Sequence, residues 1–575
     1  MIIVEFRQNM QFDTPYLTKQ IIAYIGNKRR LLSLIYAALE QSGITIGAGA
    51  TFADLFSGSG VVSRFAKSLG FAVYANDWEP YAETLSRGFV ALDKSEWQTL
   101  FNGAEQFQAL IDHINALPDP PDDDQYIARY FAPKSDDISQ ADFRTERLFY
   151  TRRNALVIDK TRNYIEQHFP DKDDPRRHCL IALLLYEAAT HTNTSGVFKA
   201  FHKGFGGHGK DALSRILAPI ALHPPVLIDS VAPVYVFRQD ANALVRMLPA
   251  LDVAYLDPPY NQHQYGSNYH LLNTIAVWDK IPAPVQLDEH GVLANKAAIR
   301  ADWTNTRSPY CSKKTATEAF RDLVRHIRAK RILVSYSSDG IIPFETMKQI
   351  CLEKGFVSIV TSDYTVYRGG KQSNARKNTD IEFILVIDTT RPATAACGER
   401  IDKVMLERQI RLLLRRRYNR ERLEKQTILT NDRLIINVDG DSADAIDNKR
   451  AIVFYHADAL TLSLPDDIDL AVFDFRQLKK IAAVLEYCAC ATKTEELAAL
   501  LRLTNDSSIP LARVKKYVRL IPATLKKFAQ KKYRAEFYAM LEKVRDLETS
   551  RADVYPLIAE KISAVVRQAE IRFAS

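Results

Sequence analysis

The sequence predicts an α/β fold in which a parallel sheet with crossover helices carries a helical insert and precedes a second, α+β region. Helix and strand patterns alternate from residue 21 to about residue 90. A helix-rich stretch interrupts this rhythm over residues 97–230, and short apolar runs then resume until about residue 390. Because a β-α-β order is typical of parallel sheets, we expect one α/β domain with a large insert.

The first elements support this order. Residues 19–43 have a helical pattern that is interrupted at Gly26 and ends near Gly43. The stretch "TFADLFSGSGVVSRFAKSLG" predicts a strand, a glycine turn and a helix, and "FAVYANDWEPYAETLS" predicts a second strand that leads into a helix. Glycine permits the tight turn that joins a strand to its crossover helix.

The later elements follow the same logic. In the insert, "RNALVIDKTRNYIEQHF" and "CLIALLLYEAATHT" predict helices, whereas "VYVFRQD", "VAYLDPPY", "RILVSYSSDG" and "EFILVID" predict strands. Proline and small residues over 389–400 suggest a linker. Beyond it we expect strands around 433–438, 451–455 and 468–473, followed by helices.

Size and composition restrict the class of protein. A chain of 575 residues and 65.2 kDa exceeds one ordinary core, so we expect two or three domains. Glu5 interrupts the N-terminal apolar run, which argues against a signal peptide, and no apolar stretch reaches the roughly 18 residues of a membrane helix. A net charge of +8 is mild for this size, so a polyanionic partner has to be argued from local patches.

The six cysteines are scattered, and only Cys488 and Cys490 lie close together. A single closely spaced pair makes a zinc site a poor interpretation. Free thiols in a reducing cytoplasm are the better expectation, and we predict no metal site.

The glycine turn has the features of a nucleoside site. Asp54 ends the first predicted strand, Gly58 and Gly60 form the turn, and Asp77 ends the second strand, where an acid can accept hydrogen bonds from ribose hydroxyls. The third glycine of a dinucleotide fingerprint is missing, which disfavours an NAD enzyme. A merely tight turn is the alternative.

The stretch "LDVAYLDPPYNQHQYGSNY" is the most informative in the chain. Asp257 lies at the carboxyl end of a predicted strand, where open α/β sheets bind their ligands. Pro258 and Pro259 fix the backbone in an extended form, so the Asp257 carboxylate and a prolyl carbonyl give two rigid acceptors, as an aromatic amine requires. Tyr260 offers a flat face for a planar base. An edge strand capped by a turn explains one proline but not this order of residues.

The order of these motifs resembles the Dam-like (alpha) group of S-adenosylmethionine-dependent adenine-N6 DNA methyltransferases. The motifs are "YIGNKR", "DLFSGSG", a long insert and "DPPY", and the resemblance covers residues 14 to 390. It implies a Rossmann-like methyltransferase domain formed by 14–96 and 231–390, with a mostly parallel sheet in which "EFILVID" is antiparallel. It also implies that the insert, 97–230, recognises the target.

The resemblance assigns roles to single residues. Lys28 is expected to hold the methionine carboxylate of the cofactor, although a solvated charge cluster explains Lys28 equally well. Asp77 is expected to hold the ribose, Trp78 to pack on the cofactor adenine, and Asp240 and Ala241 to bind the adenine edge. The other residues expected at the cofactor are Tyr24, Asp54, Phe56, Gly58, Gly60 and Asp257. Asp257, Pro258, Pro259 and Tyr260 are the expected catalytic residues.

Several polar residues are candidates for DNA contact. Asn261, Tyr265 and Asn268 follow the catalytic motif and are expected in the wall of the base pocket, with an ordered polar loop as the equal alternative. In the glycine-rich stretch 193–210 we expect the lysines to meet phosphates and the histidines to reach base edges. These residues are Lys199, His202, Lys203, His208 and Lys210. A mobile solvated loop is the alternative.

The region 400–575 contains two basic segments. Nine basic residues against three acids lie between Lys403 and Lys425, and nine with no acid lie between Arg513 and Arg534. We expect a basic α+β domain that contacts DNA. A fused nuclease is disfavoured, because the acids of "LPDDIDLAVFDF" lack a spaced acid–x–lysine partner.

These observations predict a site-specific adenine-N6 methyltransferase that acts on duplex DNA after base flipping. We expect it to be the modification enzyme of a bacterial restriction–modification system, cytoplasmic and nucleoid-associated, with a separately encoded endonuclease as partner and no membrane association. The alternatives are a cytosine-N4 DNA methyltransferase, an adenine-N6 RNA methyltransferase and a DNA-binding module without catalysis. The sequence leaves the recognition site and the oligomeric state open.

Overall fold

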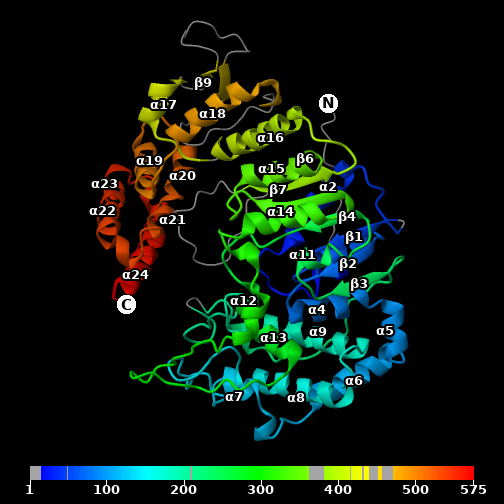
Figure 1. Cartoon of the computed structure of the whole chain (residues 1–575). Helices are drawn as coiled ribbons and strands as arrows, with labels where there is room; N and C mark the ends of the chain where they lie inside the picture. Colours follow the sequence, from blue (N-terminus) through cyan, green and yellow to red (C-terminus); the bar gives the residue numbers. More distant parts are fainter. Residues whose placement is uncertain are drawn as a thin grey trace. The chain divides into compact units, whose positions relative to one another are not determined.

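The computed structural model describes residues 14–47, 49–207, 210–361, 381–414, 416–429, 433–438, 451–455 and 470–574. The described residues divide into two compact units: the first contains those up to 361 and 382–398, and the second contains residue 381 and those from 399 onward. Figure 1 shows the chain coloured from the N-terminus to the C-terminus.

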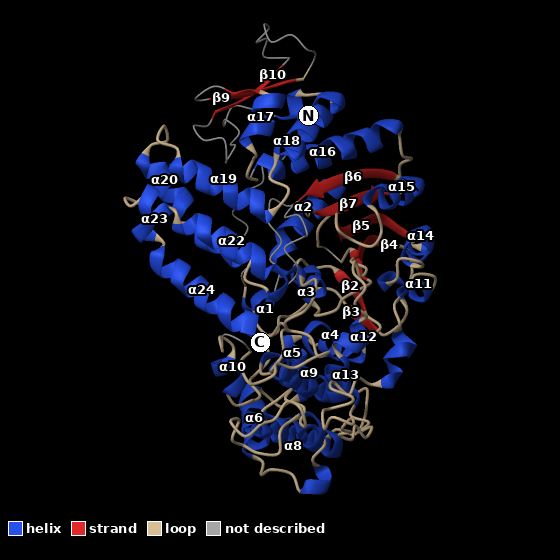
Figure 2. Cartoon of the chain, turned by 90° about the vertical axis from the view of Figure 1, so that its left-hand side faces the viewer, coloured by secondary structure: helices blue, strands red, loops and turns tan. Residues whose placement is uncertain are grey.

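The first unit is built on a seven-stranded sheet in the order β3-β2-β1-β4-β5-β7-β6, whose strands are red in Figure 2. The strands are β1 (Thr51–Asp54), β2 (Ala72–Asn76), β3 (Val234–Phe237), β4 (Leu251–Leu256), β5 (Ala329–Ser337), β6 (Phe356–Thr361) and β7 (Glu382–Asp388). β3, β2, β1, β4 and β5 pair in parallel, whereas β7 pairs antiparallel with β5 and β6. The predicted α/β fold with an antiparallel "EFILVID" strand is therefore confirmed.

The strands of the sheet are apolar because helices cover them. On one face Phe52, Val253 and Leu333 are fully buried with side chains of α1, α2 and α3. Before β1 lie α1 (Pro15–Thr18), η1 (Lys28–Leu31) and α2 (Leu32–Ser42), and between the strands lie α3 (Val61–Ser68), α4 (Pro80–Ser86), α11 (Ala241–Leu244), α14 (Ala316–His326) and α15 (Phe344–Lys354).

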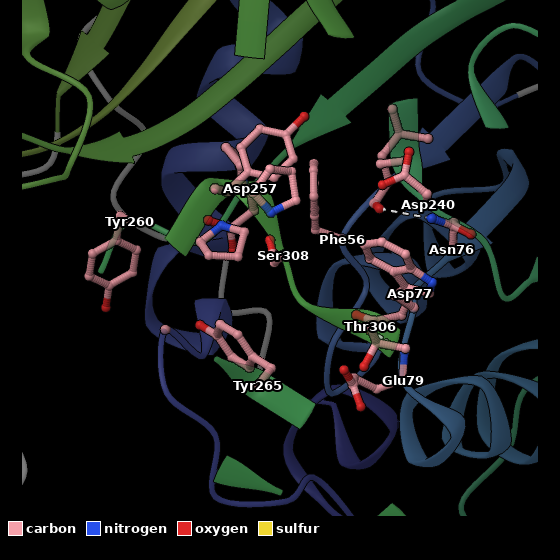
Figure 3. A pocket seen from close by; sticks show the side chains of 18 of the residues that line it. Phe56, Asn76, Asp77, Glu79, Asp240, Asp257, Tyr260, Tyr265, Thr306 and Ser308 are labelled. Atoms are coloured by element: carbon pink, nitrogen blue, oxygen red, sulfur yellow. Dashed lines mark hydrogen bonds between the residues drawn. The ribbon is translucent and has the colours of Figure 1, made fainter. Parts of the chain in front are cut away.

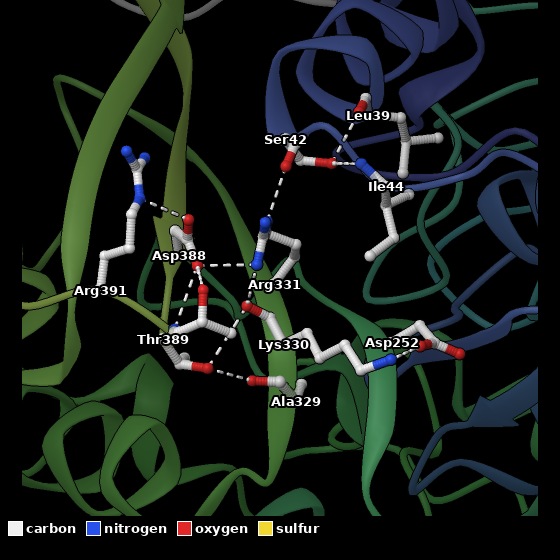
Figure 4. A network of polar contacts seen from close by, with 11 residues as sticks. Leu39, Ser42, Ile44, Asp252, Ala329, Lys330, Arg331, Asp388, Thr389 and Arg391 are labelled. Carbon is white, nitrogen blue, oxygen red and sulfur yellow. Dashed lines mark hydrogen bonds and ion pairs between the residues drawn. The ribbon is translucent and has the colours of Figure 1, made fainter.

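A polar network fixes the antiparallel strand to its neighbours (Figure 4). Asp388, at the end of β7, pairs with Arg331 of β5 at 2.7 Å and with Arg391 at 2.8 Å. Arg331 also donates to the carbonyl of Ser42, the last residue of α2, at 2.6 Å. Arg331 and Arg391 each pair with one carboxylate oxygen of Asp388, and Arg331 also donates to the C-terminal carbonyl of α2. The charges of these side chains are therefore paired and hydrogen-bonded at the same time.

The insert is helical and shares one core with the segment that follows β4. η2 (Arg87–Ala91) and α5 (Lys94–Leu100) lead into it, and its further elements are α6 (Ala104–Ala116), η3 (Asp122–Asp124), α7 (Ile127–Phe131), α8 (Arg152–His168), α9 (Pro175–Thr190) and α10 (Leu213–Leu217). The segment after β4 forms α12 (Tyr265–Asn268), α13 (His270–Val277), η4 (Ala301–Thr306) and η5 (Pro309–Cys311). Phe149 and Leu184 of the insert and Leu271 of α13 are buried in the same cluster. The two helices predicted in the insert are confirmed as α8 and α9.

Two local predictions were wrong, and one strand was missed in the first unit. Residues 21–25 are not helical, because the buried guanidinium of Arg64 binds the carbonyls of residues 16, 19 and 20 and holds this segment open. β6 was not anticipated. Residues 470–472 form a short 3-10 turn rather than a strand, since Asp474 caps the helix that begins at Phe475.

The second unit combines a small sheet with many helices. Its strands, in the order β10-β9-β8, are β8 (Ile428–Leu429), β9 (Arg433–Asn437) and β10 (Ala451–Tyr455). Beyond Thr394 the helices are α16 (Ala395–Leu414), α17 (Arg420–Gln426), η6 (Leu470–Val472), α18 (Phe475–Cys488), α19 (Lys493–Asn505), α20 (Leu511–Val518), α21 (Ile521–Lys526), η7 (Lys531–Tyr533), α22 (Arg534–Arg545), α23 (Leu547–Ser550), η8 (Tyr555–Leu557) and α24 (Ala559–Ala574). Among the described residues no helix is both long and apolar enough to cross a membrane. All six cysteines are buried and free, as predicted.

Candidate functional site

A cleft opens where four strands of the sheet end (Figure 3). It encloses about 730 Å³, including its open mouth. Phe56 follows β1, Asp77 and Trp78 follow β2, Asp240 follows β3, and Asp257 follows β4; all of them line it. The carboxyl ends of parallel strands are where this class of sheet binds its ligands.

The glycine turn is held by the acid that ends the second strand. The Gly58 N–H donates to Oδ2 of Asp77 at 2.8 Å, and the Glu79 N–H donates to Oδ1 at 3.0 Å. Gly58 has φ +51°, and a Cβ added there would lie 2.6 Å from the Tyr24 ring. Only glycine therefore lets the turn pass this close to Tyr24.

Two predicted cofactor residues lie under the turn rather than in the cleft wall. Asp54 is buried and accepts the Ser63 hydroxyl at 2.7 Å, and burial raises its pKa to about 7. Gly60 has φ +78° and is the N-cap residue that precedes α3. Both residues shape the turn from behind.

The catalytic motif contains a buried ion pair. The ammonium of Lys28 lies 3.0 Å from Oδ1 of Asp257 and 5.7 Å from the centre of the Tyr260 ring. Burial lowers the pKa of Lys28, but Asp257 and Glu382 outweigh it, so the pKa is raised above its usual value. Burial raises the pKa of Asp257, and Lys28 opposes this. Lys28 is thus directed at the catalytic acid and not at the cleft.

The part of the cleft wall that contains Tyr24 is built from packed tyrosine rings. The rings of Tyr24 and Tyr269 stack with their centres 5.0 Å apart, and Tyr265 lies 5.3 Å from Tyr24. The Tyr269 hydroxyl accepts the Ile25 N–H at 2.8 Å, and the Tyr265 hydroxyl donates to the Ile25 carbonyl at 3.3 Å. The segment before Gly26 is therefore fixed against the helices that follow the D-P-P-Y motif.

The structure brings most of the predicted site residues together. Those that line the cleft are Tyr24, Phe56, Asp77, Trp78, Asp240, Ala241, Asp257, Pro258, Pro259, Tyr260 and Tyr265. Asn261 accepts the His263 N–H at 3.0 Å in a local turn. Asn268 is buried, and its carbonyl accepts the Phe198 N–H at 2.7 Å, so it supports the wall from behind.

Several lining residues were not predicted. Asn76, Glu79 and Gln239 come from the strand ends, and Thr306, Ser308, Pro309 and Tyr310 come from the segment after α13. Glu79 accepts the Asn273 amide at 2.6 Å, and burial raises its pKa to about 7. Its position two residues after Asp77 was the one signal in the sequence.

The charged side chains that line the cleft are all acids within the described part of the chain. They are Asp77, Glu79, Asp240 and Asp257. Together with the aromatic rings they form a surface that suits a ligand with a positive charge and a planar base.

The glycine-rich loop of the insert contacts the segment behind the cleft through Phe198. Asn193 is fully buried; its amide donates to the Leu148 carbonyl at 2.9 Å and accepts the Gly206 N–H at 3.2 Å. Lys199, Lys203 and Lys210 are exposed and His202 is half-buried, whereas His208 lies outside the described residues. The loop thus has a fixed base and exposed cations.

The two basic segments of the second unit differ. In the first, Arg420 and Arg422 form ion pairs with Glu424 and Glu495 at 2.8 Å, and Arg417 pairs with Glu496. In the second, the side chains are mostly exposed: Lys515, Lys516, Arg519, Lys526, Lys531, Lys532 and Arg534. The second segment is the stronger candidate for contact with a polyanion.

Comparison with known proteins identifies one matching family model and several proteins of similar sequence. A family model described as D12 class N6 adenine-specific DNA methyltransferase matches residues 24–331. The type II methyltransferase M.NlaIII of Neisseria lactamica is 28% identical over 371 residues, which are 64% of this chain and 99% of that protein. The modification methylase LlaI of Lactococcus lactis subsp. lactis is 29% identical over 374 residues, 63% of this chain and 54% of that protein. The modification methylase StsI of Streptococcus sanguinis is 27% identical over 381 residues, 64% of this chain and 52% of that protein, so the chain spans about half of these last two.

Proposed function

The chain belongs to the D12 class of N6 adenine-specific DNA methyltransferases, and from that premise we propose that it methylates the N6 amine of adenine in a specific duplex sequence, with S-adenosylmethionine as donor. One observation carries the proposal. The cleft joins Phe56, which precedes the glycine turn, and Asp77 on one side to Asp257 and Pro258 on the other (Figure 3). A nucleoside cofactor and an acceptor amine can therefore meet within one site.

The residues present fit S-adenosylmethionine. The turn at Gly58 leaves no room for a Cβ, Asp77 keeps lone pairs for two hydroxyls, and Asp240 lies beside the rings of the cleft. When bound, the cofactor supplies an electrophilic methyl group on a positively charged sulfur. The three aspartates and the aromatic faces of the cleft favour that charge. Asp77 would hold the ribose, and Phe56 and Trp78 would contact the adenine.

The acceptor end acts through hydrogen bonding. The Asp257 carboxylate and the Pro258 carbonyl would accept the two N–H groups of the target amine. This favours a tetrahedral nitrogen with its lone pair directed along the cleft, and no base has to remove a proton first. The Lys28 ammonium, 3.0 Å away, favours the ionised form of Asp257, which is the stronger acceptor. Alignment of the two reactants supplies much of the acceleration, since a well-oriented pair contributes about 7–11 kcal/mol.

Duplex DNA has to release its base before it can enter the cleft. Base flipping costs a few kcal/mol. Stacking on Tyr260, at about 1–3 kcal/mol, offsets part of this. We assign the exposed Lys199, Lys203 and Lys210 of the insert loop to phosphate contact, with His202 and His208 at base edges and Asn261 in the pocket wall. The exposed cations of the second unit give a further DNA contact.

The biological setting follows from the relatives. Their names describe type II methyltransferases and modification methylases. We propose that this enzyme is the modification partner of a separately encoded endonuclease and acts on chromosomal DNA in a bacterial cytoplasm.

The decisive experiment is transfer of label from tritiated S-adenosylmethionine to unmethylated duplex DNA, followed by digestion and separation of the nucleosides. We expect label in N6-methyl-2′-deoxyadenosine, and none with Asp257→Ala. Label in the cytosine fraction would keep the mechanism and correct the acceptor. Cofactor binding without label in DNA would direct the same assay to RNA, and absence of cofactor binding would refute the proposal.

A further inference from the structure

The segment 306–310 contributes four residues to the wall of the cleft. Thr306, Ser308, Pro309 and Tyr310 all line the cleft, and Figure 3 shows Ser308 between Asp257 and Phe56. The segment belongs to neither the glycine turn nor the D-P-P-Y motif. It therefore adds side chains that no sequence motif supplies.

This segment is fixed at its middle and at its start. The Gln264 side chain accepts the Ser308 N–H at 2.8 Å and donates to the Ser308 carbonyl at 3.0 Å. Gly266 leaves room for Thr306 beside Glu79, because a Cβ there would lie 3.0 Å from a side-chain oxygen of each. Both backbone groups of Ser308 are satisfied, so the segment holds one position.

Tyr310 is fixed at its hydroxyl. Its O–H lies 2.6 Å from Oδ1 of Asn242. The orientation of that amide is determined, because its Nδ2 donates to the Ala319 carbonyl and to Asp322, both at 2.8 Å, which leaves Oδ1 as an acceptor. The ring is buried and has one defined position.

The ring of Tyr310 forms a corner with that of Phe56. Their centres are 5.3 Å apart and their planes meet at 85°. A planar base that lies flat on one ring meets the edge of the other, which is the favoured geometry for aromatic contacts. Asn242 follows Asp240 and Ala241, which line the cleft, and Figure 3 shows Asp240 on the side of the cleft opposite Tyr260. The corner therefore lies at the end away from Tyr260, whose ring packs on Tyr336.

We propose that Tyr310 is a cofactor-binding residue whose ring, with Phe56, encloses the adenine of S-adenosylmethionine beside Asp240, and that Asn242 positions this ring. The inference rests on the function proposed above and adds a binding residue to it. It commits Tyr310 to the cofactor and not to the target base.

The test is calorimetric titration of S-adenosylmethionine into the full chain without DNA. Loss of one aromatic face is expected to weaken binding by about 10- to 100-fold in Tyr310→Ala. Tyr310→Phe keeps the ring and should bind within about tenfold of the wild type. Asn242→Ala frees the ring and should fall between the two. In kinetics Tyr310→Ala should raise the KM for the cofactor and leave kcat at saturation close to that of the wild type.

Tyr126→Ala is the matched control, since Tyr126 is a buried tyrosine of the insert whose hydroxyl donates to the Ile281 carbonyl. It should lower the melting temperature and leave cofactor affinity unchanged. If Tyr310→Ala does not fold, Tyr310→Leu keeps an apolar side chain without the aromatic face and should show the same weakening.

The outcomes separate the two proposals. If the wild type does not bind S-adenosylmethionine, the function proposed above fails. If the wild type binds and Tyr310→Ala binds equally well, the assignment of Tyr310 is overturned. An unchanged cofactor affinity with a raised KM for DNA would place Tyr310 at the target base instead.

Discussion

The Lys28–Asp257 pair makes the sharpest prediction about catalysis. Lys28→Met removes the ammonium that lies 3.0 Å from the catalytic carboxylate and keeps a side chain of similar length. An adjacent cation lowers the pKa of a carboxyl by about 1–3 units, so its loss should raise the pKa of Asp257 by that amount. Burial already raises this pKa, so both causes then act in the same direction.

The expected effect on rate follows from the fraction of ionised Asp257. Where the pH lies below the pKa of Asp257 in both proteins, a rise of about 1–3 units lowers this fraction by about 10- to 1000-fold, and kcat/KM should fall with it; at higher pH the loss should be smaller. Activity should then rise about tenfold per pH unit as Asp257 ionises. A buried carboxylate without its partner destabilises the fold by about 3–5 kcal/mol. Because the folded state of the variant binds the proton more tightly than the unfolded chain, this loss should shrink as the pH falls.

The assay is the pH–rate profile of tritium transfer together with calorimetric binding of S-adenosylmethionine at each pH. Lys67→Met is the matched control, since Lys67 is a buried lysine that pairs with Asp93 at 2.7 Å outside the cleft. It should lower stability without moving the profile. A Lys28→Met profile parallel to that of the wild type, with weaker cofactor binding, would refute the reasoning. It would restore the prediction from sequence that Lys28 holds the methionine carboxylate.

Gly58→Ala places a Cβ 2.6 Å from the Tyr24 ring, so cofactor binding should fall by about tenfold or more, as calorimetry would measure. Glu79 has a pKa of about 7, so the folded chain keeps a proton that the unfolded chain loses near pH 4.5. The free energy of unfolding should therefore decrease by up to about 3 kcal/mol as the pH rises from 4.5 to 7. Glu79→Gln should flatten the melting temperature over that window. Lys203→Ala with Lys210→Ala should weaken DNA binding and reduce the slope of log K against log salt by about 2.

Each of these variants has a control and a contrary result. Gly43 also has a positive φ but no atom near its Cβ, so Gly43→Ala should affect stability and spare cofactor binding; equal effects would contradict the steric argument. An unaltered pH dependence in Glu79→Gln would mean that Glu79 is ionised in the folded chain. Lys172→Ala, at an exposed turn between α8 and α9, should leave the salt slope unchanged. If the double variant Lys203→Ala with Lys210→Ala also left this slope unchanged, the proposed contact between the loop and DNA would be refuted.

The fold was predictable wherever neighbours along the chain determine the backbone. The glycine turn after β1 and the prolines after β4 impose their geometry locally, so the strand ends they mark were found. The helix predicted at residues 21–25 does not form, because the side chain of Arg64, from α3, donates hydrogen bonds to the carbonyls of residues 16, 19 and 20. A helical pattern in the sequence does not show that a side chain distant in the chain will donate hydrogen bonds to the backbone carbonyls of that segment.

The candidate site divides in the same way. The sequence by itself determined that an acid, two prolines and an aromatic ring end a buried strand, and that a glycine turn and Asp77 precede them. Only the tertiary structure decided that Lys28 faces Asp257, that Glu79 meets Asn273 and that Tyr310 closes the cleft beside Phe56. These partners lie far apart in the chain, and their contacts arise because strands distant in sequence end at one edge of a sheet, where buried charges and rings have to find partners.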